Sequence, residues 1–293
     1  MFNNLIGNEK IKKKLEEILK ADNIFHSYMF IGTEGIGKKE YAKEFAKGIL
    51  CTEKNKPCGK CKSCIEFDSK NNPDFYYIGL GDEKSIKIET VRQMQKKIQE
   101  LPIVSNKKVY IIDDFEFMTR EAQNCLLKTI EEPPEFVTII LVTANESRIL
   151  NTIKSRCLKI NFNNIEDEIL NAFLEEKYNI KNISENTLKS YNGSLGKAIQ
   201  MQEKEEIYEK VEKVFNNIEK YNIINAKNSL DVLYKEKDYI IELLDYINVI
   251  FINKAKTDVK YIEYIGKIEE TKKKINSNCN YDMTIDSLLL YIF

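Results

Sequence analysis

The sequence predicts an α/β fold with a parallel sheet, followed by a region built only of helices. In the first part of the 293-residue chain, short apolar runs typical of buried strands alternate with helical patterns. This alternation indicates a parallel sheet that is covered on both faces. From residue 206 onward only helical patterns occur, and their apolar stripes are typical of helix bundles. The length allows two domains or more, each with its own core.

The first strand is predicted at 28–31, after an amphipathic helix at 8–20. Pro102 ends a helix that begins at Ile88, and Leu101 is expected to point inward on the apolar face of that helix. The remaining strands are predicted at 75–78, 108–112, 137–144 and 158–162. The remaining helices before residue 206 are predicted at 38–50 and 119–130, with short helices within 166–204.

A glycine loop joins the first strand to the following helix. Gly32, Gly35, Gly37 and Lys38 give the pattern Gly-x-x-x-x-Gly-Lys at this strand-to-helix junction, which is the context of a P-loop. The glycines let successive backbone N–H groups turn toward a phosphate at the positive end of a helix, and Lys38 adds a full charge. These residues indicate phosphate binding. The competing interpretation is a glycine loop that binds nothing.

Lys39 follows the P-loop lysine, at the position where a working P-loop has serine or threonine. That hydroxyl ligates the magnesium of the bound nucleotide. Lysine lacks the hydroxyl and adds a second cation instead. The sequence therefore predicts the shape of a nucleotide site with altered chemistry, one that can hold an anion such as sulfate or pyrophosphate.

Two carboxylates, Asp113 and Asp114, follow the apolar strand 108–112. A central parallel strand that ends in acids is typical of a site at the carboxyl edge of the sheet. In P-loop proteins the first acid holds the magnesium shell and a following acid orients the attacking water. An equally good interpretation is that the pair caps the next helix.

Four cysteines lie close together in the sequence, with the spacing Cys51-x6-Cys58-x2-Cys61-x2-Cys64. Four thiolates at such spacing can close a tetrahedron around zinc, and no histidine or acid joins the set, so the predicted site is closed and structural. The competing interpretation is a group of unrelated free cysteines. Seven cysteines in all, an odd number, argue against a pure disulfide framework and favour a reducing compartment.

The composition excludes several classes of protein. Lysine and arginine number 45 against 46 acidic residues, so the net charge gives no general attraction to nucleic acid or acidic lipid. No apolar stretch approaches the roughly 20 residues that span a bilayer, and no secretion signal is visible at the N-terminus. We therefore expect a cytoplasmic protein without a membrane contact.

Taken together, the motifs resemble the clamp-loader branch of the AAA+ ATPases, that of bacterial DNA polymerase III. The resemblance covers roughly residues 1–205 and depends on motifs that occur in the same order as in the family. These are His26 to Phe30, Gly32 to Lys39, Cys51 to Cys64, Asn72 to Asp74, Val109 to Asp114, Ala122 to Pro133 and Ser155 to Cys157. The cysteine insert between the two nucleotide motifs, with Ser-Arg-Cys downstream, is highly specific as a set.

The resemblance implies three domains and a place in a larger assembly. The expected domains are an AAA+ P-loop domain at 1–163 with its zinc insert at 51–64, a helical lid at 164–205 and a helical collar at 206–293. Members of the family form a five-subunit ring through the collar. The implied partners are the tau or gamma subunits and the delta subunit, the sliding clamp, and primed DNA contacted without regard to its sequence.

The same resemblance gives meaning to three departures from the family pattern. Lys39 replaces the magnesium-binding hydroxyl, Asp114 replaces the glutamate of Asp-Glu, and Gly196 stands where the lid arginine would be. These changes imply that any ATP bound at Gly32 to Lys39, Asp113 and Asp114 is not hydrolysed. The chain would then be a non-hydrolysing component of the DNA polymerase III holoenzyme.

Arg156, in Ser155-Arg156-Cys157, keeps the identity that the family uses. The resemblance implies that it acts as an arginine finger on the nucleotide bound by a neighbouring subunit, where a guanidinium stabilises charge that develops on the phosphate. Without the family context, a surface or bridging arginine is the simpler interpretation. Two other functions stay open: an ATP-hydrolysing clamp-loader subunit that uses Lys38 and Asp113, and a zinc-stabilised DNA-binding module.

Overall fold

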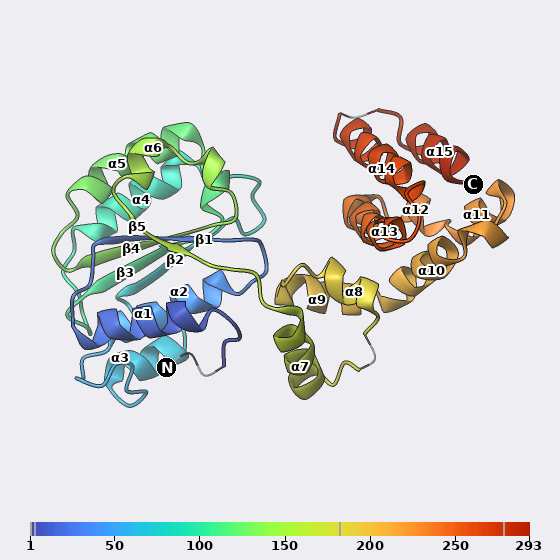
Figure 1. Cartoon of the computed structure of the whole chain (residues 1–293). Coiled ribbons are helices and arrows are strands. Elements are labelled where there is room, and N and C mark those ends of the chain that lie inside the picture. The colour runs from blue at the N-terminus through green and yellow to red at the C-terminus, as the bar shows by residue number, and fades with distance from the viewer. Residues whose placement is uncertain (1, 3, 182, 278) are drawn as a thin grey trace. The chain divides into compact units, whose positions relative to one another are not determined.

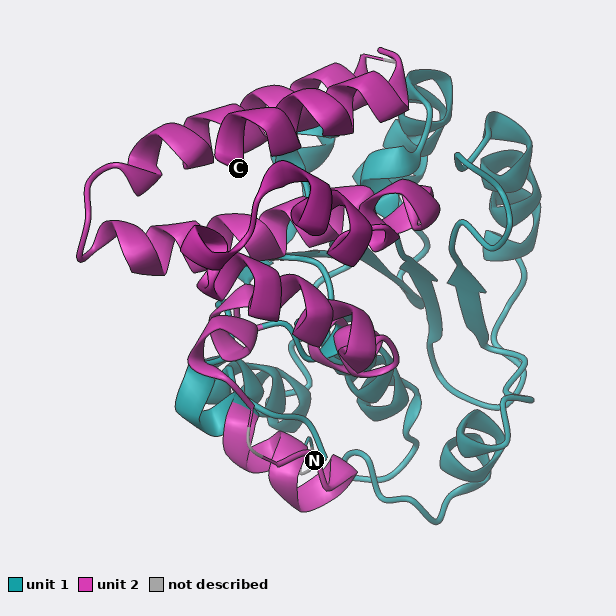
Figure 2. Ribbon diagram, turned by 90° about the vertical axis from the view of Figure 1, so that its right-hand side faces the viewer, with its two compact units in different colours: residues 1–170, 194–196 teal, residues 171–193, 197–293 magenta. Residues whose placement is uncertain are grey.

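The computed structural model describes all residues except 1, 3, 182 and 278, and the described residues form two compact units. Figure 2 distinguishes them by colour: the first comprises residues 1–170 with 194–196, and the second 171–193 with 197–293. The sequence-based division into a lid at 164–205 and a collar at 206–293 stays a prediction. Within the described residues, no helix has both the length and the apolar character that crossing a membrane requires.

The first unit is a parallel five-stranded sheet between two layers of helices (Figure 1). The strand order is β2-β3-β4-β1-β5, and every neighbouring pair is parallel. The strands are β1 (Ser27–Ile31), β2 (Phe75–Ile78), β3 (Lys108–Ile112), β4 (Val137–Thr143) and β5 (Leu158–Asn161). The helices are α1 (Glu9–Lys20), α2 (Lys38–Leu50), α3 (Lys62–Asp68), α4 (Ile88–Ile98), η1 (Phe115–Phe117), α5 (Arg120–Glu131), η2 (Glu146–Arg148) and α6 (Asn151–Lys154). The predicted α/β fold is confirmed.

The two faces of the sheet carry separate cores because strand residues alternate between them. Tyr28 and Phe30 of β1 pack with α1 and α2, whereas Met29 packs with the α4 and α5 side. Strand β3 alternates in the same way, with Val109 on the α2 face and Tyr110 on the other. The continuous apolar runs in the sequence therefore mark strands that are buried on both faces.

One inward residue of the sequence prediction was wrong. Helix α4 ends at Ile98, and Leu101 is 73% exposed in the loop that follows, instead of lying on the inner face. Pro102 has no N–H for the Ile98 carbonyl and disfavours helical conformation at Leu101, so the helix does not continue to Leu101. Helix α3, which has seven residues, was not predicted.

After β5 the described chain is helical. The elements are α7 (Asp167–Tyr178), α8 (Glu185–Ser190), α9 (Leu195–Gln202), α10 (Glu205–Asn216), η3 (Ile218–Lys220), α11 (Ile223–Ser229), α12 (Val232–Lys235), η4 (Lys237–Tyr239), α13 (Ile240–Ala255), α14 (Tyr261–Asn276) and α15 (Tyr281–Ile292). Helix α13 is the centre of the second unit and packs against α8, α10 and α14. Its inward residues include Leu244, Ile247 and Phe251, and Phe251 meets Phe215 of α10 edge to face.

Candidate functional site

The P-loop lies between β1 and α2, as the sequence predicted. Gly35 and Gly37 have φ angles of 75° and 93°, a left-handed conformation that favours glycine. The Lys38 ammonium donates to the carbonyl oxygens of Gly32 and Thr33 at 2.7 and 2.6 Å. Burial lowers the pKa of Lys38, while the charge of Glu116 acts in the opposite direction. Lys38 is thus held at the base of the loop, only 7% exposed.

Lys39 pairs with the carboxylate at the end of β3. Its Nζ lies 3.4 Å from Oδ2 of Asp113 and 4.6 Å from the ring centre of Tyr77. The Tyr77 hydroxyl donates to the same Oδ2 at 2.7 Å. Burial raises the pKa of Tyr77, and its hydrogen bond to Asp113 raises it further, so the phenol stays a donor. The structure therefore brings together two residues that the sequence placed in one site, and adds Tyr77, which sequence reasoning missed.

Asp114 does not cap the following turn with its side chain, so the capping interpretation does not hold for this residue. Burial, with the nearby charge of Asp113, raises the pKa of the Asp114 carboxyl. Sequence reasoning also missed Glu116, which is buried and accepts a hydrogen bond from the Ala144 N–H at 2.9 Å through Oε1. In the sequence Glu116 is marked only as an acid two positions after the Asp pair.

Gly196 contacts Gly35 in the middle of the P-loop. Its N–H donates to the Gly35 carbonyl at 2.9 Å, and a Cβ added to Gly196 would stand 2.9 Å from the Gly35 Cα. A Cβ added to Gly35 would come within 2.2 Å of Ser194 Oγ. The position at which the resemblance implies a lid arginine therefore forms a close backbone contact, and neither glycine admits a side chain without movement.

The four predicted cysteine ligands, Cys51, Cys58, Cys61 and Cys64, come together. Their sulfur atoms all lie within 4.8 Å of one another. Sulfur atoms around a tetrahedral zinc are separated by about 3.8 Å, given Zn–S bonds of about 2.3 Å. The Cys51 and Cys61 sulfur atoms are 3.9 Å apart, so the donor set fits a zinc ion. The interpretation as scattered free cysteines is wrong.

Backbone N–H groups stabilise the sulfur atoms of this cluster. The N–H groups of Cys61 and Cys64 point at the sulfur atoms of Cys58 and Cys61, at 3.2 and 3.4 Å. Burial acts to raise the pKa of Cys61, but hydrogen bonds from Thr52 and Cys64 outweigh it and lower the pKa to about 6. Burial raises the pKa of Cys64. One thiolate is therefore readily available, which favours the binding of a cation.

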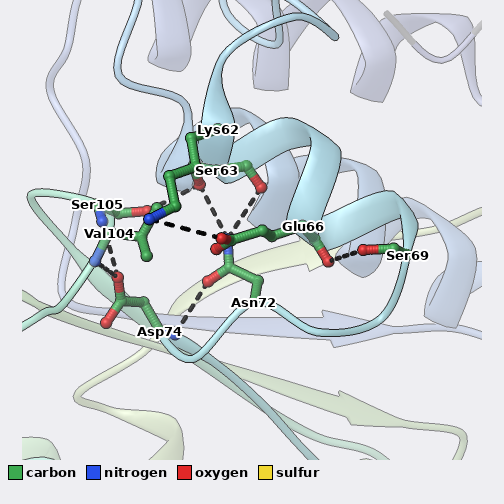
Figure 3. A network of polar contacts seen from close by, with 8 residues as sticks. All are labelled: Lys62, Ser63, Glu66, Ser69, Asn72, Asp74, Val104 and Ser105. Carbon is green, nitrogen blue, oxygen red and sulfur yellow. Dashed lines mark hydrogen bonds and ion pairs between the residues drawn. The ribbon is translucent and has the colours of Figure 1, made fainter.

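A polar network fixes helix α3 of the insert to the start of β2 (Figure 3). The Asn72 amide donates to the carbonyl and the hydroxyl of Ser63, both at 2.9 Å. The Ser63 hydroxyl pairs with that of Ser105 at 2.8 Å. Buried polar groups of this kind are stabilising when each has a partner. The insert is thus attached to the loop between α4 and β3.

Asp74 holds the loop between α4 and β3 in place through hydrogen bonds to its backbone. Its carboxylate is fully buried and accepts three backbone N–H groups, those of Ile103, Val104 and Ser105, each at 2.7 Å. Asparagine would turn its NH2 group toward at least one of these donors and would remove the negative charge that strengthens all three hydrogen bonds. Asp74→Asn is expected to lower the free energy of unfolding by about 3 kcal/mol, measured by urea denaturation.

The matched control for this substitution is Asp82→Asn, since Asp82 is exposed. It is expected to change the free energy of unfolding by less than about 0.5 kcal/mol. Equal stability of Asp74→Asn and wild type would contradict a structural role for the three hydrogen bonds.

Arg156 lies apart from the P-loop residues, just after α6. Among the described residues its polar partners are Glu131, Thr152 and Ser155. Nη2 is 2.9 Å from the Glu131 carboxylate at the end of α5, and Nη1 donates to the Thr152 carbonyl at 2.9 Å. The two charged side chains are 39% and 43% exposed, so the pair is worth at most about 1 kcal/mol.

Arg156 also lines an open hollow of about 340 Å³ on the surface of the first unit. Phe25 and Leu158 lie in the same hollow and are 42% and 37% exposed. A half-exposed guanidinium beside exposed apolar side chains is suited to contact another molecule. Sequence reasoning named Arg156 but not its partner Glu131, which it quoted only as part of a motif.

Comparisons with known proteins agree with these observations. The model of the family described as DNA polymerase III, delta subunit, matches residues 7–166. Over 211 residues the chain is 36% identical to the DNA polymerase III subunit gamma of Buchnera aphidicola subsp. Baizongia pistaciae, covering 69% of this chain and 56% of that protein. Over 219 residues it is 29% identical to the subunit delta' of Bacillus subtilis, covering 74% and 65%.

A solved structure shows the same fold. The gamma subunit-related protein of Thermotoga maritima is 19% identical, with a TM-score of 0.50 over 95% of this chain and 98% of that one. The chain spans only part of many curated relatives, as little as 26% of the subunit tau/gamma of Haemophilus influenzae, to which it is 34% identical over 62% of its own length. Because the family match covers more than half of the residues, the chain belongs to the AAA+ clamp-loader family of DNA polymerase III.

Proposed function

We propose that this chain is the delta' subunit of the clamp loader, a non-hydrolysing stator that helps load the sliding clamp onto primed DNA in the cytoplasm. The observation that carries the proposal is the ion pair between Lys39 and Asp113, at the place where a hydrolysing subunit holds magnesium. The stator retains the P-loop fold but does not use it to hydrolyse ATP.

In this proposal the chain completes a five-subunit ring with tau or gamma subunits and the delta subunit. Its domains are the AAA+ domain at 1–163, the lid at 164–205 and the collar at 206–293, which joins the ring. Zinc at the four cysteines is structural and closes the insert 51–64. Arg156 acts in trans on the nucleotide of the neighbouring ATPase subunit, and contacts with DNA are made to its phosphates.

A second candidate is an ATP-hydrolysing gamma or tau subunit. The identity to gamma and tau relatives, up to 36%, exceeds the 29% to delta', which favours this candidate. In that case Lys38 contacts the phosphates and Asp113 holds magnesium, and Lys39 must leave Asp113 when nucleotide binds. A zinc-stabilised DNA-binding module is disfavoured by the net charge of −1.

Lys38→Ala separates the two clamp-loader candidates. We expect the isolated chain to show no magnesium-dependent ATP hydrolysis, and the reconstituted loader to keep its full rate when only this chain carries Lys38→Ala. Steady-state phosphate release with clamp and primed DNA is the measurement. A loss of rate on Lys38→Ala would replace the stator with the ATP-hydrolysing subunit.

A further inference from the structure

The residues at the P-loop do not fit the magnesium ion that a hydrolysing P-loop requires. Such an ion is held through the hydroxyl after the P-loop lysine and through the carboxylate at the end of the neighbouring strand. Lys39 stands at the first position, and its ammonium lies 3.4 Å from Asp113, which stands at the second. A divalent cation there would meet a fixed positive charge and no hydroxyl ligand.

The Lys39 ammonium is held where it is by two further features. The oxygen of Asp113 that it approaches also accepts the Tyr77 hydroxyl, and the ammonium lies over the Tyr77 ring. Asp113 is only 8% exposed, whereas the Lys39 side chain is 46% exposed, so water screens the attraction between the two charges in part. The Lys39 ammonium is thus a cation supplied by the chain itself, beside the Asp113 carboxylate at the end of β3.

The anion-binding side of the loop is intact. Gly37 caps α2 in a left-handed conformation, and a Cβ added there would meet nothing within 4 Å. The first N–H groups of a helix have no partner within the helix. Lys38 uses two of its three N–H donors on backbone carbonyls.

We propose that this P-loop binds the phosphate chain of a nucleoside triphosphate, or an inorganic polyphosphate, without a divalent cation, with the Lys39 ammonium in the place of magnesium. The inference rests on the proposed function, because it takes the site as one that binds without hydrolysis. Lys38 and the N–H groups at the helix N-terminus supply the positive charge for the anion. Lys39 neutralises the Asp113 carboxylate, which would otherwise repel the anion. Free ATP is therefore preferred over its magnesium complex, whose cation competes with Lys39.

The test is calorimetric titration of the zinc-loaded full chain with ATP and with inorganic tripolyphosphate, in magnesium-free buffer and in excess magnesium. Wild type is expected to bind the free anion and to lose about tenfold in affinity when magnesium is added. Lys39→Thr restores the hydroxyl and is expected to reverse this order. Lys43→Thr changes a partly exposed lysine on the same helix that pairs with Glu40; it is the matched control and should behave as wild type.

Two results would overturn the inference: a wild-type chain that binds ATP only with magnesium, or one that binds no anion while Lys39→Thr does. In the second case Lys39 blocks the site, and the stator function would still stand. Hydrolysis by the isolated chain would instead overturn both. Equal affinity for ATP and tripolyphosphate would support a site that recognises phosphates alone, and tighter ATP binding would support one that also recognises the nucleoside.

Discussion

Replacing Arg156 by alanine is expected to lower ATP hydrolysis at the neighbouring subunit's site by on the order of 10³, the usual effect of an arginine finger supplied in trans. The guanidinium is half exposed beside an open hollow, and its only charged partner within the described chain is Glu131. An exposed ion pair of this kind is weak enough to be exchanged for a phosphate. Single-turnover hydrolysis by the reconstituted loader, with this chain alone substituted, measures the effect.

Glu131→Gln separates a finger from a structural arginine. If Arg156 served only to hold Glu131, removing either partner would have the same result. We expect Glu131→Gln to change the rate by less than about threefold, in keeping with a surface pair of at most about 1 kcal/mol. Arg156→Lys keeps the charge but lacks the planar fork and should stay strongly impaired. An unchanged rate with Arg156→Ala would rule out the finger.

Cys61→Ser is expected to reduce the zinc content from one ion per chain to none. The pKa of the Cys61 thiol is lowered to about 6, so this thiol ionises readily. Its sulfur lies 3.9 Å from that of Cys51. Structural zinc sites bind with on the order of 10 kcal/mol in small domains, so losing the ion removes most of the order of the insert. Elemental analysis measures the metal, and limited proteolysis within 52–60 should become at least about tenfold faster.

The control for this change is Cys279→Ser, because Cys279 is exposed and far along the sequence from the cluster. It should retain one zinc ion and the wild-type rate of proteolysis. A wild-type chain without bound metal, or a Cys61→Ser chain that still holds one ion, would contradict a four-cysteine zinc site.

Much of this fold could be predicted because its signals are local. The strands of the sheet are continuous apolar runs, and the P-loop and cysteine cluster depend on residues that are close in sequence. The pairing of Lys39 with Asp113 depends instead on strand order, since β1 and β3 are separated in the sheet by β4. The motifs place both residues in one predicted site, but no spacing rule in the sequence reveals that their side chains pair.

The other missed features have a common physical cause. Asp74 acts on backbone N–H groups, which every residue but proline possesses, so nothing in the sequence marks Ile103, Val104 and Ser105 as its partners. Glu131 meets Arg156 only because α5 and α6 lie side by side on one face of the sheet. Leu101 looked like a core residue because it continues a helical period that the chain does not follow.

The contact between Gly35 and Gly196 leaves no room for a side chain at position 196. An arginine placed at 196 would bring its Cβ to 2.9 Å from the Gly35 Cα, in the backbone of the P-loop. The P-loop and the segment 194–196 must separate first, which breaks the hydrogen bond from Gly196 to Gly35. If the chain is the non-hydrolysing subunit proposed above, an arginine at 196 alone would break this contact before it could contribute to ATP hydrolysis.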